Sequence, residues 1–65
     1  MRFRKGDLLA NKHMPNQIPV ARVERLTKDG IVHCVNLVAC ATMKKGAEFQ
    51  FNPEVWTGFI LHSRE

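Results

Sequence analysis

The stretch from residue 20 to residue 37 constrains the fold more than any other part of the chain. It contains two runs rich in aliphatic residues, 20–26 and 31–37, on either side of the polar segment Thr27–Gly30. Asp29 and Gly30 end that segment, and an Asp-Gly pair between two such runs is typical of a β-hairpin, because glycine readily adopts the positive φ that the turn requires. The sequence therefore predicts a hairpin at the centre of the chain.

Alternation of apolar and polar residues predicts further strands on both sides of the hairpin. Phe3 lies between two arginines, which predicts a strand that begins at once; a turn follows over residues 5–7, and the first full strand covers residues 8–10. After a connector that ends in Gly46, Phe49 and Phe51 alternate with polar residues across 47–52, the pattern of a half-buried strand. Strands are thus expected along most of the chain.

The end of the chain allows two interpretations. Asn52, Pro53 and Glu54 are the residue types that begin a helix. Gly58 and the β-favouring run at 57–61 argue against a long helix. We expect a short 3₁₀ turn over 53–56 followed by a last strand over 59–62. The alternative is a β-sheet with a short C-terminal helix.

The order of these elements resembles the layout of small SH3-like barrels, including KOW and Tudor-type modules and short proteins encoded by phages or plasmids. The residues that carry the resemblance are Phe3, Gly6, Asp7, Pro19, Val20, Val23, Asp29, Gly30, Ile31, Gly46, Phe49, Phe51, Phe59, Ile60 and Leu61. The resemblance implies an all-β fold, a small barrel of about five strands, in a single domain over residues 1–65. Such barrels serve several kinds of binding, so the layout does not choose a partner.

An excess of basic residues favours an anionic partner. The chain has 10 Lys and Arg against 6 Asp and Glu, a net charge of +4. We expect a non-enzymatic module that contacts nucleic acid through a basic surface, with Trp56 stacking on an unpaired base. The residues expected to contact phosphates are Arg2, Arg4, Lys5, Arg22, Arg25, Lys28, Lys44 and Lys45. The competing interpretation is that these lysines and arginines are solvated and that Trp56 belongs to the core.

The alternative function is a small protein-binding regulator or inhibitor. The loop over residues 13–19 is bounded by prolines and has an apolar, weakly charged character that suits a protein contact, with Met14 and Ile18 as its anchors. An exposed edge strand would also serve, by pairing with a partner. Self-association is expected through the strand over 31–38, which is apolar on both faces.

No motif for catalysis or for a cofactor is present. His33, Cys34, Cys40 and His62 match no zinc spacing, and adjacent residues of a strand point to opposite faces, so we expect no metal site. The two cysteines are expected to be reduced and to pack as small apolar residues, as in a cytoplasmic protein. No apolar run approaches the length that spans a membrane, and none resembles a signal peptide.

Overall fold

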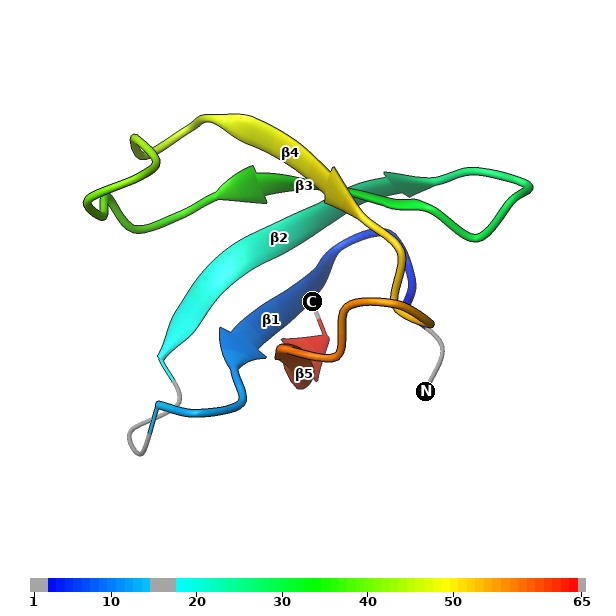
Figure 1. Cartoon of the computed structure of the whole chain (residues 1–65), viewed down its shortest axis with the longest axis horizontal. Helices are drawn as coiled ribbons and strands as arrows, with labels where there is room; N and C mark the ends of the chain where they lie inside the picture. The colour runs from blue at the N-terminus through cyan, green and yellow to red at the C-terminus, as the bar shows by residue number, and fades with distance from the viewer. Residues whose placement is uncertain (1–2, 15–17, 65) are drawn as a thin grey trace.

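The computed structural model describes residues 3–14 and 18–64 and folds them into one antiparallel sheet (Figure 1). The strands are β1 (Asp7–Asn11), β2 (Pro19–Leu26), β3 (Val32–Asn36), β4 (Glu48–Phe51) and β5 (Phe59–Arg64). Their order in the sheet is β4-β3-β2-β1-β5, so β5 returns to pair with β1. The predicted all-β class and five strands are confirmed. The described part of the chain contains no helix, and hence none long and apolar enough to cross a membrane.

The central hairpin is confirmed, with a return strand that begins one residue later than expected. The β2–β3 pairing runs from Ala21↔Asn36 to Leu26↔Val32, which leaves residues 27–31 as the connection. Gly30 has a φ of +84°, and its N–H donates to the Thr27 carbonyl at 3.1 Å. The Thr27 hydroxyl accepts from the N–H of Ile31 at 3.1 Å, so Ile31 belongs to the turn.

One face of the sheet carries the core. Ala21 and Val23 of β2 are fully buried there, as their shared face predicts, and Val32 and Cys34 of β3 lie beside them. Leu9 of β1 completes this layer, while alternate residues of β3 on the opposite face are only half-buried. The pattern follows from the period of two along each strand.

Phe3 is buried but does not belong to a strand, so the prediction of a strand beginning at once is wrong. The buried Asp7 carboxylate accepts from the Arg4 backbone N–H at 2.8 Å, and the Asp7 N–H donates to the Arg4 carbonyl at 3.1 Å. These two bonds close a turn before β1 and direct the Phe3 ring onto the core. The other Asp7 oxygen accepts from Nε of Arg64 at 3.2 Å, which joins the turn to β5.

The sheet is open, because β4 and β5 form its two edges. The segment between them is a hydrogen-bonded turn in which the Asn52 carbonyl accepts from the N–H groups of Val55 and Trp56, at 3.0 and 2.8 Å. The expected turn is therefore present, since the Val55 bond spans three residues as in a 3₁₀ turn, but the chain leaves it at once and the alternative C-terminal helix is wrong. The predicted last strand is confirmed and extends to Arg64.

The long connection between β3 and β4 is organised by Asn36, which is 7% exposed. Its side-chain amide donates to the Val38 and Lys44 carbonyls at 2.8 and 2.9 Å. Its backbone N–H donates to the Ala47 carbonyl at 2.8 Å, and its own carbonyl accepts from the Gly46 N–H at 2.7 Å. One buried amide therefore holds both ends of the connection together.

We expect Asn36→Ala to lower the free energy of unfolding by roughly 1–3 kcal/mol, because it removes the donors of two part-buried carbonyls. That is a large share of the stability of a domain of this size. Urea denaturation followed by circular dichroism measures the loss. Gln50→Ala, at an exposed position of β4, is the control and should change stability by less than about 0.5 kcal/mol. Equal stability of the two variants would show that the amide does not hold the connection.

Candidate functional site

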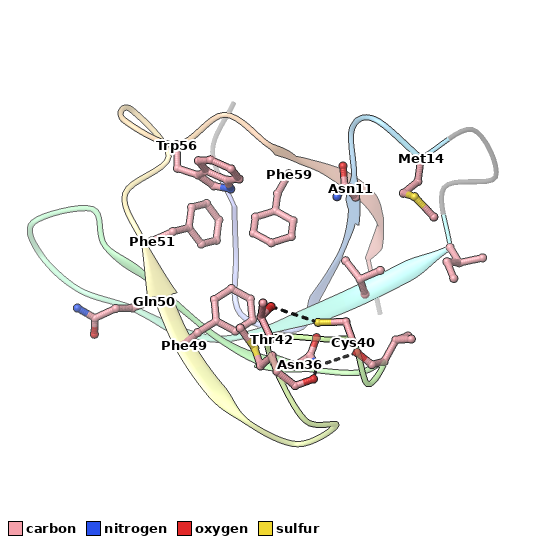
Figure 2. A pocket seen from close by; sticks show the side chains of 14 residues that line it. Asn11, Met14, Asn36, Cys40, Thr42, Phe49, Gln50, Phe51, Trp56 and Phe59 are labelled. Atoms are coloured by element: carbon pink, nitrogen blue, oxygen red, sulfur yellow. Dashed lines mark hydrogen bonds between the residues drawn. The ribbon is translucent and has the colours of Figure 1, made fainter.

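An apolar cavity of about 640 Å³ opens on the core side of the sheet (Figure 2). Phe49, Phe51 and Phe59 line it and also pack against the buried core, so the cavity continues the core outward. The facing wall comes from the β1–β2 connection and from the β3–β4 connection that Asn36 organises. The cavity therefore depends on segments far apart in the sequence.

Aromatic rings form one side of the cavity. The Phe51 and Phe59 ring centroids are 5.1 Å apart, and those of Phe49 and Phe59 are 5.8 Å apart, so rings of the two edge strands touch across the open side of the sheet. Trp56 lies beside them with 57% of its surface exposed (Figure 2). A Cβ at Gly58 would lie 2.6 Å from the Trp56 ring, so glycine is the residue that lets the ring lie against the backbone there.

Exposed apolar side chains surround the opening. Met14 and Ile18 are each 46% exposed, Val38 is 40% exposed, and all three line the cavity with Trp56. None of the described residues that line the cavity is charged. Such a continuous apolar surface is typical of an interaction site.

The expected protein anchors and the expected stacking residue thus lie at one site. Both Met14 and Ile18 belong to the β1–β2 connection and line the cavity. The loop residues between them, 15–17, lie outside the described part of the chain. Trp56 is exposed rather than part of the core, unlike the other aromatic residues. Sequence patterns did not single out Val38 or Met43 for the opposite wall. The one feature of the sequence that could have indicated these two residues is that they are large and apolar in a connector of mostly small and polar residues.

The basic residues divide between the two ends of the sheet. Lys28 lies in the β2–β3 turn, whereas Lys44 and Lys45 lie in the β3–β4 connection, at the opposite end of β3 (Figure 1). Arg4, Lys5 and Arg25 lie toward the Lys28 end, and all are exposed. Arg22 forms an ion pair with Glu24 at 3.4 Å. Arg2 lies outside the described residues.

The two cysteines lie in contrasting surroundings. Cys34 is buried, and this burial, aided by the charge of Glu24, raises its pKa from 9.0 to about 12. Cys40 is exposed at the cavity, where a hydrogen bond with the Thr42 hydroxyl lowers the pKa of its thiol. Within residues 3–14 and 18–64, no group of three or more His, Cys, Asp or Glu side chains could hold a metal ion.

Comparison with protein-family models, with curated proteins and with solved structures finds no match for this chain.

We expect one thiol of the native chain to react quickly with a disulfide reagent at pH 8, and the second only after unfolding. The thiolate is the reactive form, and Cys40 is both exposed and easier to ionise than Cys34. Absorbance of the released thiol, with and without denaturant, gives the two rates. Cys40→Ser should abolish the fast phase, and a fast phase that survives this substitution would contradict the assignment.

Proposed function

We propose that this chain is a non-enzymatic binding module that takes apolar side chains of a partner protein into the cavity. The observation that carries the proposal is an uncharged cavity, continuous with the core and surrounded by exposed Met14, Ile18, Val38 and Trp56. A volume of about 640 Å³ lies in the usual range of ligand sites. Methionine and aromatic residues are enriched at protein interfaces, and methionine adapts its shape to a partner.

The proposed role is that of a small regulator or inhibitor. We also propose that the fold is an open form of the SH3-like barrel. The strand order β4-β3-β2-β1-β5 and the short turn before β5 support this likeness. A cytoplasmic location and an origin in a phage or mobile element belong to the same proposal and rest on the sequence.

The double substitution Met14→Ser and Ile18→Ser tests the cavity. Peptides selected from a phage-displayed random library on the wild-type chain are the probe. Loss of two apolar contacts should cost about 2–3 kcal/mol of binding, or roughly a 30- to 150-fold rise in Kd by titration calorimetry.

The matched control is Leu26→Ser with Val55→Ser, two exposed apolar residues that do not line the cavity. It should leave Kd within about twofold. Equal losses in the two double variants, or no selectable peptide, would remove the cavity as the binding site.

Nucleic-acid binding is the second candidate. The grouping of exposed Arg4, Lys5, Arg25 and Lys28 toward one end of the sheet favours it. Asp29 and Glu54 lie near the same end and reduce its positive charge, which is why this candidate comes second.

A salt titration tests this second candidate. Binding to generic duplex DNA, measured by fluorescence anisotropy, should fall steeply with salt, with about 0.9 in log–log slope for each phosphate met. Arg25→Ala with Lys28→Ala should reduce the slope by about 1.8, whereas Lys44→Ala with Lys45→Ala should reduce it only if the other end of the sheet also contacts DNA. Absence of binding at low salt would discard this candidate.

A further inference from the structure

The outer edge of β4 has backbone groups without a partner strand. β4 is the last strand on its side of the sheet, and it pairs with β3 alone. The Asn36 N–H donates to the Ala47 carbonyl, which sets the register of the ladder. Because hydrogen-bonded pairs alternate in an antiparallel ladder, Phe49 and Phe51 direct their N–H and C=O groups toward β3. Glu48 and Gln50 then direct theirs outward.

One face of β4 borders the cavity. Phe49, Gln50 and Phe51 all line it, although the Gln50 side chain points away from the aromatic rings (Figure 2). Phe49 and Phe51 present the aromatic face of β4 to the cavity, and the Gln50 backbone lies between them. The outer edge of β4 therefore runs beside apolar surface.

The charges near the two ends of β4 have opposite signs, so two antiparallel copies of the strand would be electrostatically complementary. Lys44 and Lys45 precede β4, Glu54 follows it, and all three are exposed. Glu48, the charged residue within β4, is also exposed and leaves the first end with a smaller positive charge. Two antiparallel copies of β4 would place the basic end of each beside the acidic end of the other. A parallel pair would bring like charges together. The other edge strand has no such pattern, since Arg64, its one charged residue, already pairs with Asp7.

We infer that two copies of this chain pair through the outer edges of β4, antiparallel about a two-fold axis at Gln50. Gln50 then exchanges backbone hydrogen bonds with Gln50 of the second copy, and Phe49 lies opposite Phe51 of that copy. Such non-hydrogen-bonded positions bring side chains close, and aromatic cross-strand pairs stabilise sheets. The result is one ten-stranded sheet with two cavities that share a margin. This inference is independent of the proposed function.

Sedimentation equilibrium of the full chain over micromolar to millimolar concentrations tests the pairing. The 7.5 kDa chain should form a dimer of twice that mass. Gln50→Pro removes the outward N–H and should weaken dimerisation at least tenfold, whereas Gln50→Ala keeps that N–H and should stay within about threefold. Edge positions whose N–H faces outward tolerate proline, and circular dichroism checks the fold. A wild-type chain that stays monomeric, or that forms larger assemblies, would overturn the inference.

Charge exchange gives a second test that does not depend on proline. The variant K44E/K45E and the variant E54K should each dimerise roughly tenfold more weakly than the wild type, because like charges then meet at both ends of the interface. Their mixture should form a mixed dimer with near wild-type affinity, and M14S/I18S should dimerise normally. A mixture that associates no better than either variant alone would overturn the antiparallel arrangement.

Discussion

The contact of Phe59 with Phe51 and Phe49 is the interaction on which the rest of the structure depends. The two edge strands share no backbone pairing, so these rings, with centroids 5.1 and 5.8 Å apart, are what join β5 to β4. Contact between side chains leaves the backbones of β4 and β5 apart, whereas hydrogen bonding between the two strands would close the sheet. The sheet can therefore curve over a core and still leave an opening, and the opening is lined by the rings that hold it in shape.

Core and candidate site are consequently built from the same atoms. Phe49, Phe51 and Phe59 pack on the buried layer with one surface and face the cavity with another. A ligand that fills the cavity would extend the core, so its binding energy adds to the stability of the fold by mass action. Asn36 also serves both the fold and the site, because it lines the cavity and holds the β3–β4 connection that forms the opposite wall. In so small a domain, a substitution at either wall affects folding as well as recognition.

Local patterns predicted the parts of the fold that local chemistry determines. Asp29 and Gly30 predicted the hairpin, and the alternation of Phe49 and Phe51 predicted a half-buried strand. The strand predicted at Phe3 does not form, because the Asp7 carboxylate accepts a hydrogen bond from the Arg4 N–H and the chain turns there. Local patterns could not predict the cavity, because it forms where the β1–β2 and β3–β4 connections lie opposite the aromatic rings in the folded chain. Met14 and Ile18 were predicted as contacts, but only the tertiary structure brings them beside Trp56.

The pairing of β1 with β5 has a consequence for folding kinetics. Asp7 and Arg64, which meet across this pairing, are 57 residues apart in the sequence. The pairings β1–β2, β2–β3 and β3–β4 join strands that follow one another in the sequence, whereas the β1–β5 pairing must close a loop that spans nearly the whole chain. Long-range contacts of this kind slow folding. A chain in which β5 has not yet docked would expose Phe49 and Phe51 together with the edge of β1 that β5 covers in the native sheet. That transient state, rather than the native one, is where this protein is most vulnerable to aggregation.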